Sequence, residues 1–169
     1  MDYKFKTEPY EHQLHALGAS HNKENFALFM EMGTGKSKVL VDNIAMLYDK
    51  GKINAALIVA PKGVYRNWER QEIPIHMPDH IVHNVVTWSP VATKKQEKEN
   101  IKLFKHGEQL TIFLMNIEAF STKKGLDIAQ RFLLAHQTLM AIDESTTIKS
   151  PTARRTKNVL KLRNYAKYR

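Results

Sequence analysis

A glycine-containing loop between an apolar run and a long amphipathic segment constrains the fold of this chain most strongly. The apolar run is residues 26–29, the loop is Met30 to Ser37 (MEMGTGKS), and the amphipathic segment begins at Lys36. Glycines allow a tight turn that points successive N–H groups inward, and a helix start adds unpaired N–H groups and the positive end of its dipole. A strand, such a loop and Lys-Ser opening a helix together predict a nucleoside-triphosphate site.

The loop pattern gives each residue a role. Gly33, Thr34 and Gly35 would direct backbone N–H groups at phosphate oxygens, Lys36 would place a positive charge at the β- and γ-phosphates, and Ser37 would supply a hydroxyl ligand for Mg²⁺. The full pattern has glycine six residues before the lysine, where this chain has Met30. A glycine turn that binds nothing is the alternative, and it is disfavoured because Gly-Lys-Ser at such a junction is much rarer than a lone glycine turn.

The rest of the chain alternates between strand-like and helix-like segments. Apolar runs typical of strands are residues 26–30, 55–60, 85–88, 110–115 and 138–142. Helical patterns cover residues 9–18, 36–50, 62–72, 93–105 and 125–136, and a further helix is expected from Ser150-Pro151 onward. Because most of the strands are apolar throughout, we expect an α/β fold with a mainly parallel sheet covered by helices on both faces. A length of 169 residues fits one domain.

An acidic pair follows the last predicted strand directly. Asp143 and Glu144 come after residues 138–142, about 107 residues beyond Lys36. In open α/β sheets ligands bind at the carboxyl ends of the strands, so Asp143 is expected on the same edge as the loop. Asp143 would then hold Mg²⁺ opposite Ser37, and Glu144 would orient or deprotonate the water that attacks the γ-phosphate.

Composition points to a soluble, basic protein. The chain has 26 Lys and Arg against 17 Asp and Glu, a net charge of +9, and its last 21 residues carry eight basic side chains and no acidic one. Such a balance favours a polyanionic partner such as nucleic acid, although solubility is the plainer explanation. The chain has no cysteine, no secretory signal and no apolar run long enough for a membrane span, so we expect a cytoplasmic location.

Three histidines near two prolines do not indicate a metal site. His76, His80 and His83 lie around Pro74 and Pro78 in a segment without cysteine. A proline-broken backbone is a poor scaffold for a set of metal ligands, so solvated loop histidines are expected here.

With these features assembled, the chain resembles the first RecA-like domain of superfamily-2 helicases and translocases, particularly the Swi/Snf-like branch. Four stretches carry the resemblance: Pro9-Tyr10-Glu11-His12-Gln13 (the Q motif), Glu31 to Ser37 (motif I), Leu57 to Lys62 with Trp68 (motif Ia), and Asp143-Glu144-Ser145-Thr146 with Ile148 to Pro151 (motif II and its extension). In motif I of this family the glycine that Met30 replaces is often missing too.

The resemblance implies a three-layer P-loop NTPase fold of RecA-like type, Mg²⁺-assisted ATP hydrolysis and a nucleic-acid partner, with DNA expected rather than RNA. It assigns adenine recognition to Gln13. Lys62 and Asn116, at strand ends that correspond to motifs Ia and Ib, are the implied nucleic-acid contacts, with ordinary surface residues as the alternative. Ser145 and Thr146 depart from the Ala-His or Ala-Asp usual in motif II.

The resemblance also implies that half of the catalytic cleft lies outside this sequence. In the family a second RecA-like domain supplies an arginine finger, and this chain stops near the point where motif III would begin, so we expect an isolated first domain that binds Mg-ATP weakly and hydrolyses it poorly. Two other functions stay open. One is a P-loop nucleotidase or kinase without a nucleic-acid role, and the other is a non-catalytic module that docks a partner.

Overall fold

A parallel sheet forms the centre of the computed structural model, which describes residues 3–28, 30, 33–143 and 153–169. Its four strands run in the order β2-β3-β1-β4 and pair in parallel throughout. They are β1 (Ala55–Ala60), β2 (His83–Thr87), β3 (Leu110–Asn116) and β4 (Thr138–Ile142). Because the carboxyl ends of parallel strands share one edge of a sheet, the residues that follow β1, β3 and β4 lie at the same edge.

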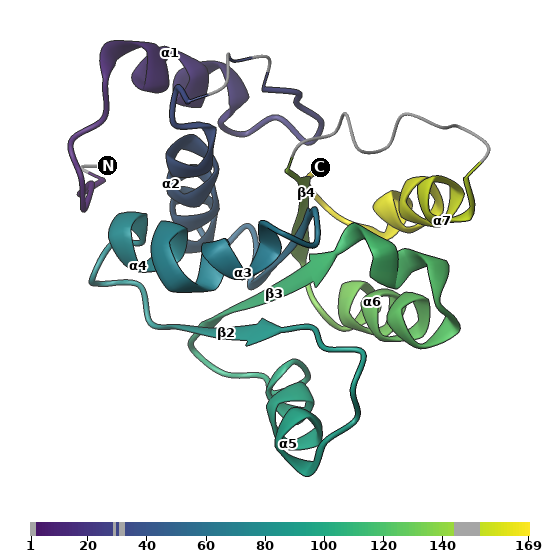
Figure 1. The fold of residues 1–169 in the computed structure, drawn as a ribbon. Helices are drawn as coiled ribbons and strands as arrows, with labels where there is room; N and C mark the ends of the chain where they lie inside the picture. Colours follow the sequence, from purple (N-terminus) through teal and green to yellow (C-terminus); the bar gives the residue numbers. More distant parts are fainter. Residues whose placement is uncertain (1–2, 29, 31–32, 144–152) are drawn as a thin grey trace.

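Helices precede, connect and follow the strands (Figure 1). They are α1 (Glu11–Ser20), α2 (Lys36–Asp49), α3 (Tyr65–Asn67), α4 (Ile73–His76), α5 (Lys94–Lys102), α6 (Lys123–Ala135) and α7 (Arg154–Leu162). A π-helical turn (Trp68–Glu72) joins α3 to α4, and 3₁₀ turns cover Ile117–Ser121 and Arg163–Tyr165. None of the helices in the described ranges is long and apolar enough to cross a membrane.

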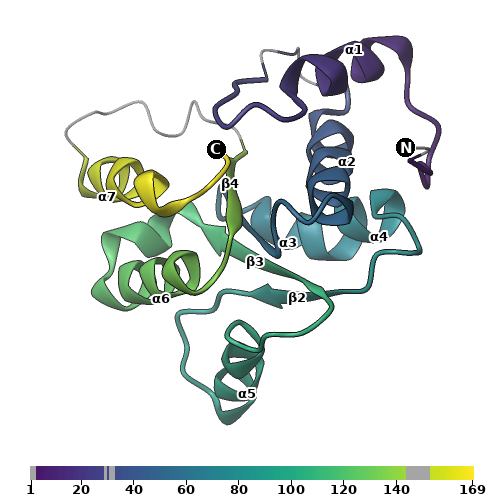
Figure 2. The ribbon, with the colours of Figure 1, turned by 180° about the vertical axis from the view of Figure 1, so that it is seen from behind.

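Two apolar layers cover the faces of the sheet. Residues of β1 alternate between them, because successive side chains of a strand point to opposite faces. Ala56 and Ile58 pack with α2 and with Trp68, while Leu57 and Val59 pack with α6 and α7. Figures 1 and 2 show these helix groups on the two sides of the sheet. The predicted three-layer α/β arrangement is therefore confirmed, and burial on both faces explains why β1 is apolar throughout and β3 at five of its seven positions.

The strand predicted at residues 26–30 is wrong for the part of it that the structure describes. Residues 26–28 and 30 have no strand conformation. The position beside β4 is instead occupied by the end of the chain, where Met140 N–H donates to Tyr168 O and Tyr168 N–H donates to Thr138 O. Arg169 in turn exchanges backbone hydrogen bonds with Glu24 and Phe26. An apolar run becomes a strand only where a ladder partner continues alongside it, and here the neighbour pairs at a single residue.

The other predicted elements exist with shifted ends. The helix predicted for 9–18 runs from Glu11 to Ser20, so Gly18 lies inside it. The helix predicted for 62–72 begins at Tyr65 and continues to His76, since its π-helical turn keeps the chain winding into α4. Helix α7 begins at Arg154 after Ala153, and the predicted cap at Ser150-Pro151 lies outside the described residues.

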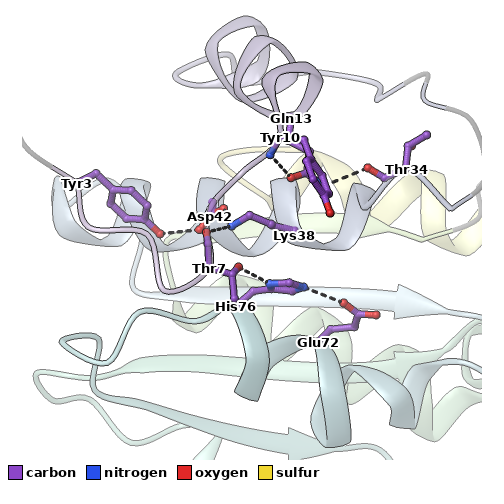
Figure 3. Close-up of polar contacts among 9 residues, drawn as sticks. All are labelled: Tyr3, Thr7, Tyr10, Gln13, Thr34, Lys38, Asp42, Glu72 and His76. Carbon is purple, nitrogen blue, oxygen red and sulfur yellow. Dashed lines mark hydrogen bonds and ion pairs between the residues drawn. The ribbon is translucent and has the colours of Figure 1, made fainter.

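The amino-terminal residues dock on α2 from Tyr3 to Thr7 (Figure 3). The Tyr3 hydroxyl donates to Asp42 Oδ1 at 3.0 Å, and Lys38 Nζ donates to the Thr7 carbonyl at 2.7 Å. Lys38 also pairs with Asp42 Oδ2 at 2.8 Å and lies 5.2 Å from the centre of the Phe5 ring. The buried charges of Lys38 and Asp42 in α2 therefore hold this segment through hydrogen bonds.

The histidines predicted to be solvated have partners. His76 lies in α4, where its Nδ1 is 2.9 Å from the Thr7 hydroxyl, and His80 Nε2 is 2.8 Å from Asp49 Oδ2. Within the described ranges no group of three or more His, Cys, Asp or Glu side chains is placed to hold a metal ion.

Candidate nucleotide site at the carboxyl edge of the sheet

The loop before α2 has the backbone that phosphate binding requires. Gly33 and Gly35 have φ angles of +77° and +80°, in the left-handed region that favours glycine. Gly35 is the N-cap of α2, and it has no side chain with which to cap the first N–H groups of the helix. These N–H groups and the positive end of a 14-residue helix dipole therefore face the loop, which is a geometry suited to an anion.

Lys36 closes the two ends of this loop. Its Nζ donates to the Met30 carbonyl at 3.2 Å, so the ammonium group lies at the mouth of the loop. Position 30 thus contributes a backbone oxygen, which a residue of any type supplies. This contact gives a physical reason why Met30 is compatible with the loop in place of the glycine in the general pattern.

Gln13 holds the loop from the side of α1 (Figure 3). Its Nε2 donates to the Thr34 carbonyl at 3.2 Å, its Oε1 accepts from the Tyr10 N–H at 2.9 Å, and its side chain is 5% exposed. His12 Nε2 lies 2.9 Å from the same Thr34 carbonyl. The structure therefore brings Gln13 to the phosphate loop, and adenine recognition by this amide stays a prediction.

Gly35 is the loop position at which a side chain is least tolerable. A Cβ built on it would lie 2.2 Å from Gln13 Nε2, at a φ angle that L-residues disfavour by about 1–2 kcal/mol. We expect Gly35→Ala to displace Gln13 and weaken ATP binding at least ~10-fold, the equivalent of about 1.4 kcal/mol, measured by isothermal titration calorimetry.

The matched control is Gly18→Ala in α1, where an added Cβ meets no atom within 4 Å. Alanine is the better helix former by up to about 1 kcal/mol, so this variant should bind ATP normally and unfold at the same or a higher temperature. Equal ATP affinities for the two variants would contradict the role given to Gly35.

Asp143 lies at the end of β4, as the chain order predicted. Its backbone N–H donates to Val59 O at 2.8 Å, which ties it to β1. Its carboxylate Oδ2 accepts from the indole Nε1 of Trp68 at 3.1 Å. Glu144, the predicted catalytic partner, lies outside the described residues.

A second carboxyl group approaches Asp143 from the π-helical turn. Burial raises the pKa of Glu72, and the negative charge of Asp143 raises it further. On its other side Glu72 Oε2 is 3.6 Å from His76 Nε2. The pKa of His76 is lowered, first by burial and then by the charge of Lys38, so both side chains are shifted toward their neutral forms.

The two predicted nucleic-acid contacts differ in exposure. Lys62 is exposed just beyond β1, where a phosphate can reach its ammonium group. Asn116 ends β3 with 9% exposure, and its Nδ2 donates to Glu118 Oε2 at 3.1 Å. The greater exposure of Lys62 therefore favours it over Asn116 as a contact to a nucleic-acid backbone.

A comparison with known protein families identifies the family of this chain. A sequence model of the SNF2-related domain matches residues 12–168. The chain belongs to the SNF2-related domain family. The match contains the Q-motif residue Gln13, the phosphate loop and Asp143, so all three lie within the SNF2-related domain.

Among solved structures, this SNF2-related domain is similar to the SWI2/SNF2 ATPase core of Sulfolobus solfataricus, which was solved in complex with double-stranded DNA. The TM-score is 0.66 and the sequence identity is 17%, so the likeness shows a shared fold. The match covers 99% of this chain and 32% of the Sulfolobus chain. The SNF2-related domain thus spans about a third of the length of that chain. No curated protein sequence gave a significant match.

Two parts of the site escaped prediction from the sequence. The sequence places Trp68 within a motif but does not predict its partner. Its contact with Asp143 joins residues 75 positions apart. Lys38 and Asp42 form a buried i,i+4 pair in the helix that follows the loop. The second feature has a signal in the sequence, because opposite charges four residues apart are helix neighbours. The first has none.

Proposed function

We propose that this SNF2-related domain is the ATP-binding domain of a nucleic-acid-dependent ATPase of the helicase or translocase kind. The observation that carries the proposal is the left-handed glycine loop at the start of α2, which lies toward the sheet edge where β4 ends before Asp143 (Figures 1 and 2). A phosphate cradle and a carboxylate on one edge are the two halves of a Mg-nucleotide site.

The described residues fit Mg-ATP. Gly33, Thr34 and Gly35 would bind phosphate oxygens through their N–H groups, Lys36 would exchange the Met30 carbonyl for a phosphate, and Ser37 and Asp143 would hold Mg²⁺. Mg²⁺ in nucleotide sites uses one or two protein oxygens together with phosphates and waters, so no larger cluster is required. Bound Mg²⁺ supplies the charge that makes the γ-phosphoryl group open to attack. Glu144 is the residue proposed to orient or deprotonate the attacking water.

A basic surface supports a nucleic-acid partner. Helix α7 buries Thr156, Val159 and Leu162 against the domain and turns its charged side outward. The exposed basic side chains from this helix to the end of the chain are Arg154, Lys157, Lys161, Arg163, Lys167 and Arg169. The similar Sulfolobus core was solved with double-stranded DNA, so DNA is the nucleic acid that we propose here. Binding through such side chains weakens steeply with salt, because it releases counterions.

We further propose that this chain binds Mg-ATP but turns it over slowly. Phosphoryl transfer in such sites needs a charge that approaches the γ-phosphate from the side away from the loop, commonly an arginine finger. The domain covers 32% of the Sulfolobus chain. The arginines of α7 lie on a helix that packs on the opposite face of the sheet from α2. The finger is therefore proposed to come from outside these residues.

The test is ATPase turnover by the 169-residue chain and by the longest natural form of the protein, each with single- and double-stranded DNA and RNA. We expect slow turnover by the chain alone and turnover by the longer form that double-stranded DNA stimulates at least ~10-fold and that added salt suppresses. Stimulation by RNA alone would reassign the partner. ATP turnover indifferent to every nucleic acid would favour a nucleotidase or kinase, and no ATP binding would favour a docking module.

A further inference from the structure

The helix after β1 contains an irregular turn that hydrogen-bonds to Asp143. Helix α3, the π-helical turn and α4 form one winding segment, and the π-turn is visible in the Ile73 N–H, which donates to Trp68 O five residues earlier. An extra residue in a helical turn changes the direction of the side chains that it carries, and such turns are frequent at functional sites. The first side chain of this turn is Trp68.

Trp68 is a rigid donor fixed in the core. Its side chain is 1% exposed and packs in the apolar layer between α2 and the sheet. Its single polar atom, Nε1, donates to Asp143 Oδ2 at 3.1 Å. An indole N–H buried without a partner costs about 1–3 kcal/mol, so the buried Trp68 N–H favours keeping this hydrogen bond.

Asp143 is thereby attached twice to the same structural unit. Its backbone N–H is bonded to Val59 in β1, and its carboxylate is bonded to Trp68 in the helix that follows β1. Two attachments define where the chain leaves β4 and which way the carboxylate turns. Trp68 is the side chain that hydrogen-bonds to this carboxylate within the described residues.

The chemistry of the donor matters for a cation site. An arginine or lysine partner would bring a positive charge that repels Mg²⁺, whereas a neutral indole orients the carboxylate and leaves its negative charge for the metal. None of the ion pairs between described residues involves Asp143. Removing a hydrogen-bond partner of this kind typically lowers metal affinity about 10- to 100-fold.

We infer that Trp68 is a positioning residue for the nucleotide site: its indole N–H orients the Asp143 carboxylate toward Mg²⁺. The inference rests on the proposed function, because it assigns Asp143 to the metal. A purely structural Trp68 would affect folding alone. A positioning Trp68 sets the Mg²⁺ concentration at which nucleotide binds.

The first experiment removes the N–H. We expect Trp68→Phe to raise the Mg²⁺ concentration for half-maximal binding of a non-hydrolysable ATP analogue about 10-fold, with the affinity for the metal-free analogue unchanged. Calorimetry on the 169-residue chain gives both numbers. The matched control is Trp88→Phe, which removes the other tryptophan of the chain, 3% exposed in the opposite apolar layer. This control should bind at the Mg²⁺ concentration of the parent.

A second variant separates the N–H group from the shape of the ring. With Trp88→Phe as background, Trp68 is the single tryptophan, and biosynthetic replacement by benzothienylalanine exchanges its N–H for sulfur while keeping the bicycle. The replaced protein should show the same tenfold shift, which keeps the test decisive even if Trp68→Phe does not fold. In the unreplaced background, Mg²⁺ with the analogue should change Trp68 fluorescence, and Asp143→Asn should remove that change.

The outcomes distinguish this inference from the proposed function. If the parent chain binds the analogue with Mg²⁺ but the benzothienyl protein has an unchanged Mg²⁺ midpoint, Trp68 is structural only and the inference is wrong. If the parent chain binds no nucleotide at any Mg²⁺ concentration, the proposed function fails first, and Trp68 loses its role with it.

Discussion

Lys36→Ala is expected to weaken ATP binding by about 10- to 100-fold. Charge-assisted hydrogen bonds contribute about 1.5–3 kcal/mol each, and Lys36 is the ammonium group at the mouth of the loop. In the free protein its Nζ has only the Met30 carbonyl, at 3.2 Å, as its hydrogen-bond partner among the described residues, so the fold should be nearly unaffected. Calorimetric titration with Mg-ATP measures the affinity, and circular dichroism checks the fold.

The matched control for this variant is Lys52→Ala. Lys52 is exposed, and because it precedes β1 it lies toward the opposite edge of the sheet from the loop. It removes the same charge from the protein and should leave the ATP affinity unchanged. Equal losses for both variants would mean that the overall positive charge attracts ATP, and the specific role of Lys36 would be lost.

Lys38→Met is expected to destabilise the domain by about 3–5 kcal/mol, because it leaves a buried carboxylate without its cation. Lys38 and Asp42 are 5% and 1% exposed, and their charged atoms are 2.8 Å apart. The change also frees the Thr7 carbonyl, which holds the amino-terminal segment on α2. In a domain of this size the loss corresponds to a fall in Tm of roughly 10 °C, measured by thermal unfolding.

Two further variants test the cause of that loss. Lys102→Met breaks a 2.9 Å ion pair with Glu99 in which the side chains are 46% and 35% exposed, and should cost at most about 1 kcal/mol. The double variant Lys38→Met with Asp42→Leu removes both buried charges and should recover part of the stability. If Lys38→Met were no more harmful than Lys102→Met, the buried pair would not anchor the segment.

The sequence predicts the glycine loop before α2 and the position of Asp143 better than it predicts the edge of the sheet. The loop from Gly33 to Ser37 and the place of Asp143 follow from local patterns, since glycine and a strand end define backbone geometry wherever they occur. The strand predicted at residues 26–30 is wrong for the residues of it that the structure describes, because a strand forms only beside a continuous hydrogen-bonding partner. The segment 166–169 pairs beside β4 instead. It contains one lysine and one arginine among its four residues, so it has no apolar run that would predict a strand.

Contacts between distant segments explain the remaining gap. Tyr3 and Thr7 precede the first predicted element, yet they contact α2 because its buried charges require hydrogen-bond partners. His76 reads as a loop residue, yet the π-helical turn continues the helix through it. Neither result is visible in a window of neighbouring residues.

By itself, the sequence determined that this protein has a tight glycine loop before α2, a parallel α/β fold and a carboxylate at the end of β4. These features depend on glycine conformation, apolar periodicity and chain order, all of which are local. Only the tertiary structure decided that Gln13 contacts Thr34, that Lys38 is buried with Asp42, and that Trp68 holds Asp143. Each of these is a contact made to satisfy a buried polar group, and its partner is chosen by packing across the fold.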